Sequence, residues 1–144
     1  MPVNFHQQGI NSALLRGEKR KVNSWIKQVI VSEKKKEGNI SIIFTGKHDL
    51  LKMNNSFLSH NFHTDIITFN YNQEAHISGD LFIGIEQVTE NAVEFKTTPR
   101  LELLRVIIHG VFHLIGYNDS TDKEKADMRK REDKALLLYN TKVK

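Results

Sequence analysis

Two histidines and an aspartate are spaced so that they could hold a metal ion. The string His-Gly-Val-Phe-His-Leu-Ile-Gly-Tyr-Asn-Asp places His109 and His113 one helical turn apart, and Asp119 follows shortly after. Residues at i and i+4 lie on one face of a helix, so two imidazoles there can converge on one ion. Gly116 is typical of a helix end, where the chain turns. The turn would bring Asp119 back toward the same point.

The residue types also indicate which metal and which chemistry. The chain has no cysteine, which excludes thiolate ligands, disulfides and a cysteine nucleophile. Two histidines and one carboxylate leave a coordination position open, as in catalytic zinc sites, where a bound water becomes a nucleophile near neutral pH. We predict one Zn²⁺ ion held by His109, His113 and Asp119, with nickel or another transition metal as an alternative. The competing interpretation, two core histidines satisfied by hydrogen bonds, leaves the glycine and the carboxylate unexplained.

Composition sets the broad class of the protein. The chain has 144 residues, and 39% of them are hydrophobic, which suits one domain with its own core. The first residues lack a secretory pattern and no apolar run is long enough to span a bilayer, so we expect a cytoplasmic protein without a membrane partner. The net charge of +4 suits a polyanionic partner such as RNA. Charge clusters at 18–21 and 33–37 are expected to be solvated helix ends.

Hydrophobic periodicity predicts strands and helices in the order β-α-β-α-β-β-α-α-α. Thr98 and Pro99 are typical of a helix start, and the helix that they begin is apolar around nearly its whole circumference. We therefore predict an α+β fold in which residues 1–144 form a single metal-dependent hydrolase domain. About four strands would form one sheet, packed with helices around the buried helix that bears the metal ligands. The expected ranges are a strand near Val3 and Phe5, 18–36 helix, 39–45 strand, 47–58 helix, 65–71 strand, 80–85 strand, 87–96 helix, 99–115 helix and 121–139 helix.

The histidine spacing is similar to that of metzincin proteases, His-Glu-x-x-His-x-x-Gly-x-x-His. In those enzymes the glutamate after the first histidine removes a proton from the zinc-bound water. Gly110 stands at that position here and cannot act as a base. A substrate with anionic oxygens, such as a phosphodiester, therefore fits the site better than a peptide.

The same string resembles the signature of the YbeY family, the endoribonucleases of ribosomal RNA maturation. The family motif reads His-Gly-x-Leu-His-Leu-x-Gly-Tyr-Asp-His, and the resemblance extends over about residues 40 to 138. It implies the family's fold, a metal-dependent endoribonuclease activity, and ribosomal RNA and the small ribosomal subunit as partners. The matching positions are His109, Gly110, His113, Leu114, Gly116 and Tyr117, with further matches at Met53-Asn54-x-x-Phe57, Thr64–Phe69, Gly79–Ile83, Met128 and Glu132.

Two departures from the family pattern affect the expected site. The family's third metal histidine is Asp119 here, preceded by Asn118 where the family has aspartate. A carboxylate is also a good zinc ligand, but its charge would make the metal less electrophilic. The family arginine that follows the aromatic residue is Leu58 here, so no guanidinium is available there for phosphate. We expect His60, and also His63, to bind RNA in its place, with His60 as a further catalytic candidate.

Five other residues have both a structural and a functional interpretation. The family match places Thr64 and Asp65 at the border of the cleft, and Asp80 has the same two readings, cleft or structural turn. Met128 is expected to pack beneath the metal as part of the core. Tyr117 either belongs to the core or directs its hydroxyl at the substrate.

Three functions remain open on this evidence. The first is a single-strand-directed endoribonuclease acting in ribosomal RNA processing, late ribosome maturation and quality control, catalysed by His109, His113 and Asp119 through the bound metal. The second is a metzincin-like metalloprotease, which Gly110 disfavours. The third is a non-enzymatic ribosome-binding factor with a structural metal, which the open coordination position disfavours. The cleavage site, the general base and the oligomeric state do not follow from the sequence.

Overall fold

A mixed β-sheet forms one layer of the protein in a computed structural model that describes residues 3–8, 13–58 and 64–141, with the backbone alone at 56–58. Its strand order is β1-β2-β4-β3. Strands β1 and β4 run parallel to β2, and β3 runs antiparallel to β4. The strands are β1 (Val3–Gln8), β2 (Lys36–Thr45), β3 (Ile66–Asn70) and β4 (His76–Gly84).

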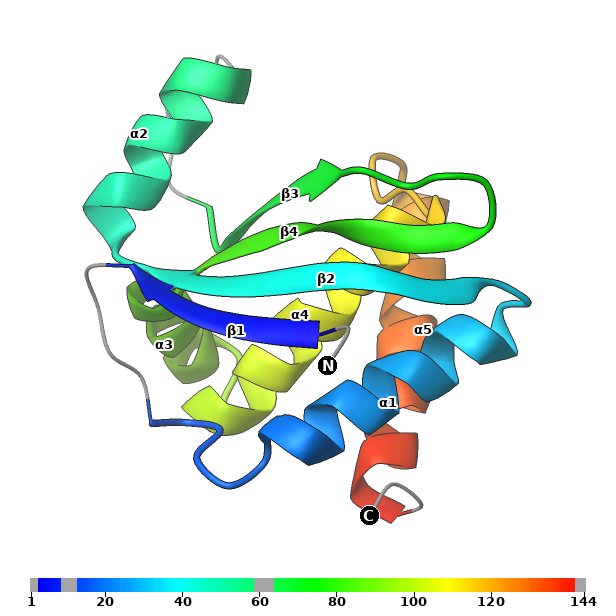
Figure 1. Ribbon diagram of the computed structural model, residues 1–144. Helices are drawn as coiled ribbons and strands as arrows, with labels where there is room; N and C mark the ends of the chain where they lie inside the picture. The colour runs from blue at the N-terminus through cyan, green and yellow to red at the C-terminus, as the bar shows by residue number, and fades with distance from the viewer. Residues whose placement is uncertain (1–2, 9–12, 59–63, 142–144) are drawn as a thin grey trace.

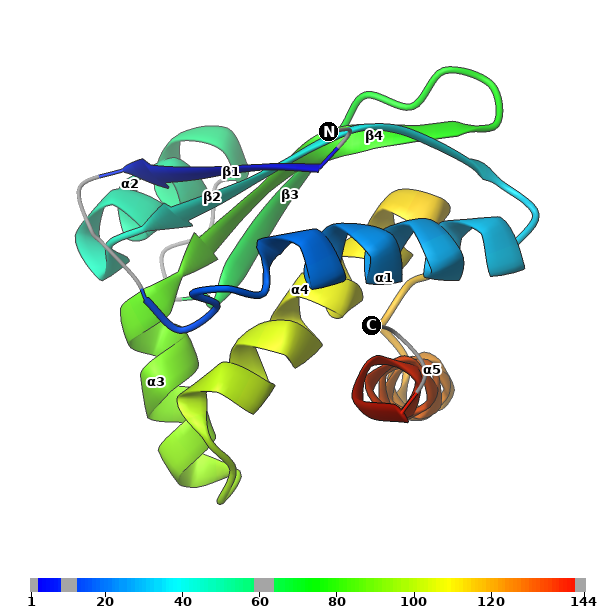
Figure 2. The same ribbon diagram turned by 60° about the horizontal axis from the view of Figure 1, so that its bottom comes forward.

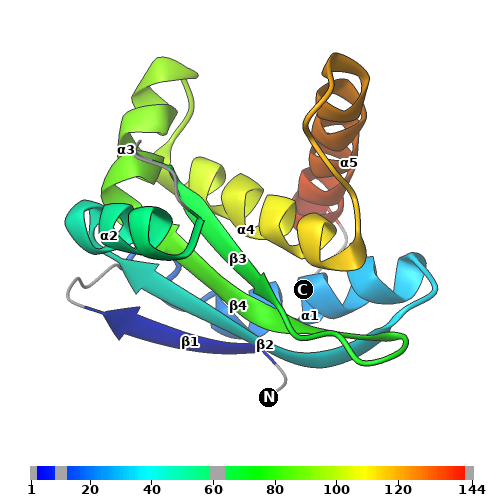
Figure 3. The same ribbon diagram turned by 90° about the horizontal axis from the view of Figure 1, so that it is seen from above.

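Helices cover one face of this sheet and part of the other (Figure 1). Four of them lie on the same side, with α4 next to the sheet and α1, α3 and α5 around it (Figure 2). Helix α2 stands over one end of the opposite face (Figure 3). This arrangement and the four-stranded sheet confirm the predicted α+β class and the order of elements. The helices are α1 (Lys19–Ser32), α2 (Lys47–Leu58), α3 (Ile85–Glu94), α4 (Pro99–Ile115) and α5 (Asp122–Thr141).

Helix α4 is the centre of the hydrophobic core. Thr98 accepts a hydrogen bond from the Leu101 amide at 3.2 Å, and Pro99 occupies the first turn, so the start signals predicted from sequence are both used. Gly116 ends the helix with φ +120°, a left-handed conformation that glycine adopts without steric cost. The buried positions lie nearly all around the helix: Glu102, Leu103, Leu104, Val106, Ile107, Ile108, Gly110, Val111, Phe112 and Leu114.

Helix α5 is fixed at both ends. Thr121 and Glu124 form the predicted capping box, because the Thr121 hydroxyl accepts from the Glu124 amide at 3.1 Å and a Glu124 oxygen accepts from the Thr121 amide at 2.9 Å. Near the other end, the Trp25 indole donates to the Ala135 carbonyl at 2.8 Å. The Tyr139 ring lies edge-on to Trp25, with ring centroids 4.9 Å apart. These contacts hold α5 against α1.

Two predicted features were wrong in detail. Helix α1 ends at Ser32 rather than Lys36, because Lys34 is left-handed with φ +61° and the Lys36 amide donates to the Ala75 carbonyl at the start of β2. Glu18 is not a solvated helix end. Its carboxylate accepts from Arg100 at 2.8 Å and from the Tyr139 hydroxyl at 2.8 Å. This contact links the start of α1 to α4 and α5.

The boundary between β4 and α3 also differs from the prediction. The strand begins at His76 and the helix begins at Ile85, because the β3–β4 hairpin continues before Asp80 and no loop separates strand from helix. Within the described ranges, no helix is long and apolar enough to cross a membrane.

Candidate metal centre

The two histidines of α4 converge as the spacing predicts. The Nε2 atoms of His109 and His113 are 3.0 Å apart, and each side chain is about one quarter exposed. At this separation the two nitrogens can share a proton in an N–H···N hydrogen bond or, when both lone pairs are free, bind one cation. A shared cation accounts for that arrangement better than a core packing role does.

Asp119 completes the group after the chain turns at Gly116. Its Oδ2 atom lies 3.2 Å from His109 Nε2 and 3.3 Å from His113 Nε2. Ligands at about 2.0–2.1 Å from a tetrahedral ion are separated by about 3.3 Å. The three atoms therefore form a triangle of the size that zinc requires. These residues, His109, His113 and Asp119, are the group of possible metal ligands in the described part of the chain.

A buried glutamate on α5 orients the first histidine. Glu132 is 5% exposed, and its Oε2 lies 2.6 Å from His109 Nδ1. A carboxylate at Nδ1 leaves the Nε2 lone pair directed at a metal and makes the ring more basic. The other oxygen of Glu132 accepts from Arg105 at 3.0 Å. Burial lowers the pKa of His109, but Glu132, with Asp119 and Asp65, raises it by more, so the pKa is above its usual range.

Sequence reasoning missed the role of Glu132, although it noted the match to the family. The available signal was its position on α5. Met128, Ala135 and Tyr139 define the buried stripe of that helix, and a carboxylate on such a stripe requires a buried partner. The only unknown was which partner, and the fold identifies it as His109.

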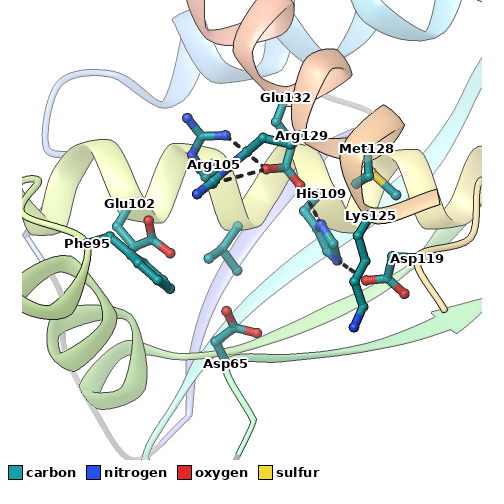
Figure 4. Close-up of a pocket in the computed structure, with 11 residues that line it drawn as sticks. Asp65, Phe95, Glu102, Arg105, His109, Asp119, Lys125, Met128, Arg129 and Glu132 are labelled. Carbon is teal, nitrogen blue, oxygen red and sulfur yellow. Dashed lines mark hydrogen bonds and ion pairs between the residues drawn. The ribbon is translucent and has the colours of Figure 1, made fainter. Parts of the chain in front are cut away.

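His109 and Asp119 line a charged cavity formed by α4, α5 and the residues at the end of α3 and just before β3 (Figure 4). Its volume is about 240 Å³. Lys125 and Arg129 enter it from successive turns of α5, and Met128 forms an apolar wall between them. The lining residues are Asp65, Phe95, Glu102, Arg105, Val106, His109, Asp119, Lys125, Met128, Arg129 and Glu132.

Two more carboxylates face this cavity. Asp65 accepts a hydrogen bond from Asn91 at 3.2 Å. Burial raises the pKa of Asp65, and only part of this is offset by the nearby His109. Burial, together with the charge of Asp65, also raises the pKa of Glu102. Asp65 is thus a carboxylate whose affinity for a proton is increased beside the metal ligands.

The structure separates the remaining predicted residues. Asp65 lines the cavity, as expected from the family match, and Met128 is buried in the core and also forms part of the cavity wall. Tyr117 does not direct its hydroxyl at the cavity, since it donates to Glu33 at 3.0 Å. Asp80 accepts from the Tyr71 hydroxyl at 3.2 Å and is not a lining residue of this cavity. Thr64 bonds to the Ile66 carbonyl at 3.3 Å, a local turn.

The region of the expected RNA contacts is only partly described. His60 and His63 lie outside the described residues, and so does the side chain of Leu58. The expectation that these histidines replace the family arginine therefore remains a prediction. The positively charged side chains that line the cavity are Arg105 of α4 and Lys125 and Arg129 of α5.

Gly110 has a packing role that explains its presence. A Cβ atom there would lie 2.7 Å from Ile66 Cδ1 and 3.0 Å from Leu81 Cδ2. The glycine thus allows α4 to approach β3 and β4 closely. A metzincin-type glutamate would collide with these sheet residues, so the helix could not keep its present position with a larger side chain there.

This α+β chain has an i, i+4 histidine pair, a carboxylate beside it and a charged cavity. These are the features of a hydrolase with a possible metal site. The family model described as Endoribonuclease YbeY matches residues 7–140. The chain belongs to the YbeY family, as its sequence resemblance implied. This confirms the family assignment made from the histidine motif.

Individual relatives agree with this assignment. The chain is 44% identical over 128 residues to Endoribonuclease YbeY of Flavobacterium psychrophilum, covering 89% of this chain and 91% of the relative. It is 40% identical over 138 residues to Endoribonuclease YbeY of Bacteroides thetaiotaomicron, covering 96% and 99%. The solution structure of TM1509 from Thermotoga maritima matches with a TM-score of 0.68 and 28% identity, covering 95% of this chain and 88% of that one.

Proposed function

We propose that this protein is a metal-dependent endoribonuclease that cuts single-stranded RNA during ribosomal RNA processing and late ribosome maturation in the cytoplasm. The observation that carries the proposal is the convergence of His109, His113 and Asp119 within 3.0–3.3 Å of one another at a cavity lined by cations. Membership of the YbeY family supports RNA as the substrate. Ribosomal RNA and the small subunit are the partners that we propose from the family role.

Zinc is the metal that the site fits best. Its three donors are two imidazole nitrogens and one carboxylate oxygen at the spacing of a tetrahedral face. When bound, the ion would polarise a phosphate oxygen and activate a water molecule for attack. Nickel has similar ligand preferences, so metal analysis must precede any assignment.

The protein's own residues would supply binding, orientation and proton transfer. Lys125 and Arg129 lie one turn apart on α5 at the cavity, where they can hold adjacent phosphates of the RNA backbone. Glu132 fixes the ring of His109 through the 2.6 Å contact at Nδ1. Asp65, held by Asn91, is the carboxylate that we assign as proton acceptor, because its pKa is raised toward neutrality by burial.

The metalloprotease alternative is not favoured by the packing of Gly110. The position where a metzincin carries its general base faces Ile66 and Leu81. A non-enzymatic ribosome-binding factor with a structural metal would not need a substrate cavity beside the ligands. The cavity here has a volume of about 240 Å³, which favours an enzyme.

Cleavage of a labelled single-stranded ribosomal RNA fragment tests the proposal. We expect the wild type to cut it and both His113→Ala and chelator treatment to abolish cutting. His6→Ala is the matched control, because His6 is exposed on the edge strand β1, and it should cut normally. Equal cutting by wild type and His113→Ala would contradict the proposed site. Digestion of casein by the wild type would instead support the protease.

A further inference from the structure

A buried glutamate that lines the cavity, Glu102, accepts no hydrogen bond within the described part of the chain, although the charges of Arg105 and Arg129 act on it. Glu102 is 5% exposed and lines the same cavity as the metal ligands. Among the described residues, no hydrogen bond or ion pair reaches its side-chain oxygens. Glu132, the other buried carboxylate there, is paired with both His109 and Arg105. The Glu102 oxygens keep contact with the solvent in the cavity, so a ligand that brings N–H groups into the cavity can reach them.

An exposed aromatic ring lies on the same side of the cavity. Phe95 is 52% exposed and lines the cavity, so its ring is accessible to a ligand there. The Arg129 guanidinium lies 6.0 Å from the centre of its ring. Figure 4 shows Phe95 and Glu102 on one side of the cavity and His109 and Asp119 on the other.

The space around these two residues continues beyond the metal centre. A second cavity of about 240 Å³ shares Phe95, Glu102, Arg105 and Arg129 with the first. One water needs only about 10–15 Å³ of such space, so each cavity admits a larger group. A planar ring could stack on Phe95 while its edge reaches Glu102, with the adjoining phosphate between Arg129 and the metal ligands.

We propose that Phe95 and Glu102 form a nucleobase subsite that selects guanine next to the cleaved phosphate. This inference rests on the proposed ribonuclease function, because it supposes an RNA substrate. Proteins recognise single-stranded RNA by stacking bases on aromatic rings and by bonding their Watson–Crick edges. The guanine N1–H and N2–H₂ groups are adjacent donors that suit the two oxygens of a carboxylate. Uracil presents one N–H between two carbonyl oxygens, which a carboxylate repels.

A tryptophan reporter tests the stacking. Phe95→Trp places an indole at the subsite, and Val93→Trp is the matched control, because Val93 is 77% exposed on the same helix and lines neither cavity. The native Trp25 is fully buried and contributes a constant background. The probes are short 2′-O-methyl oligonucleotides that resist cleavage: all-uridine, the same with one guanosine, and an abasic backbone.

We expect the guanosine probe to quench the fluorescence of the Phe95→Trp variant and to leave that of the Val93→Trp variant unchanged. Phe95→Ala should weaken binding of the guanosine probe by about 5- to 140-fold, the range for loss of one base–aromatic stack. Equal quenching by the abasic backbone, or no quenching at saturation, would overturn the stacking role.

Glu102→Gln tests the recognition of the base edge. The amide keeps the size of the side chain but replaces one hydrogen-bond acceptor with a donor. That donor can bond to a carbonyl oxygen of uracil, so the variant should discriminate less against uracil. The ratio of affinities for the guanosine and all-uridine probes should fall by about 5- to 140-fold, the discrimination of one bidentate contact. Zinc content and the midpoint of thermal unfolding should not fall, since no hydrogen bond within the described part of the chain is lost. An unchanged ratio would overturn the role of Glu102.

Failure of the subsite and failure of the nuclease activity give different results. Wild-type cleavage with a cutting pattern that Phe95→Ala and Glu102→Gln leave unchanged would refute the subsite alone. Guanosine-dependent quenching in a protein that cuts no RNA would refute the nuclease activity and leave the subsite supported.

Discussion

Removing the charge of Glu132 should weaken metal binding without unfolding the protein. Its Oε2 atom lies 2.6 Å from His109 Nδ1, and the side chain is only 7% exposed, so solvent screens the contact little. Loss of such a partner typically lowers metal affinity by about 10- to 100-fold, which corresponds to about 1.4–2.8 kcal/mol. Glu132→Gln should fall at the lower end, because its amide oxygen can still accept from Nδ1–H. Glu132→Ala should fall at the upper end.

Competition for Zn²⁺ with a chromogenic chelator measures the affinity. Asp133→Asn is the matched control, since Asp133 contacts only the other arm of Arg105, at 2.7 Å, and is 59% exposed. That variant should bind zinc as the wild type does. Circular dichroism must show that all variants are folded. A folded Glu132→Ala variant with wild-type affinity would refute the claim that this carboxylate orients a metal ligand.

The pH dependence of zinc binding gives the same test a second readout. Burial lowers the pKa of His109, yet Glu132, Asp119 and Asp65 together raise it by more, so the pKa lies above its usual range in the metal-free protein. Zinc must displace that proton, and the apparent affinity therefore falls as the pH drops through the raised pKa. In Glu132→Gln the pKa of His109 should be lower. The affinity of that variant should begin to fall at a lower pH than that of the wild type.

Four further predictions concern the site and its supports. Asp65→Asn should lower kcat for RNA cleavage by about 10²- to 10⁴-fold with unchanged zinc content, and an unchanged kcat would exclude Asp65 as proton acceptor. Asp119→His should retain zinc whereas Asp119→Ala should lose most of it, as measured by metal analysis after gel filtration; equal zinc in both would exclude Asp119 as a ligand. Gly110→Ala should destabilise the fold by about 1–3 kcal/mol in denaturant unfolding, because its Cβ would meet Ile66 at 2.7 Å. Glu18→Gln should lower the free energy of unfolding by about 1 kcal/mol at neutral pH. The contacts of Arg100 lower the pKa of Glu18 below 4.5, so the stabilisation by the Glu18 carboxylate is complete above pH 4.5 and is lost as the pH falls through the lowered pKa. The difference in stability between variant and wild type should therefore vanish in acid.

The fold and the convergence of His109, His113 and Asp119 were predictable because local signals specify them. Thr98, Pro99 and Gly116 define α4 by capping chemistry that depends on neighbouring residues alone. The spacing of His109 and His113 then determines that they share a face, whatever the rest of the chain does. Even the return of Asp119 follows from a left-handed glycine, here with φ +120°.

The rest of the cavity depends on contacts between distant segments. The contact between Glu132 and His109 depends on the packing of α5 against α4, which no local sequence pattern encodes. Asp65 and Phe95 also come from distant segments, just before β3 and at the end of α3. Glu18 illustrates the same limit: in sequence it belongs to a charged cluster, yet it contacts Arg100 and Tyr139. Charged residues on a buried stripe indicate that a partner exists, but only the tertiary structure identifies it.

Two neighbouring faces of α4 explain why the site is both rigid and accessible. On one face Gly110 lets the helix contact Ile66 and Leu81 of the sheet closely. This close packing fixes the position of α4 on the sheet. On the neighbouring face His109 lines the cavity, where α5 supplies Glu132 at 2.6 Å. A hydrolytic metal site needs ligands held by a rigid element and an open position for substrate. The sheet contact and the histidines use neighbouring faces of one helix, so the packing that fixes Gly110 also fixes the positions of His109 and His113. For the same reason, a glutamate at position 110 could not serve the metal without breaking the contact with the sheet.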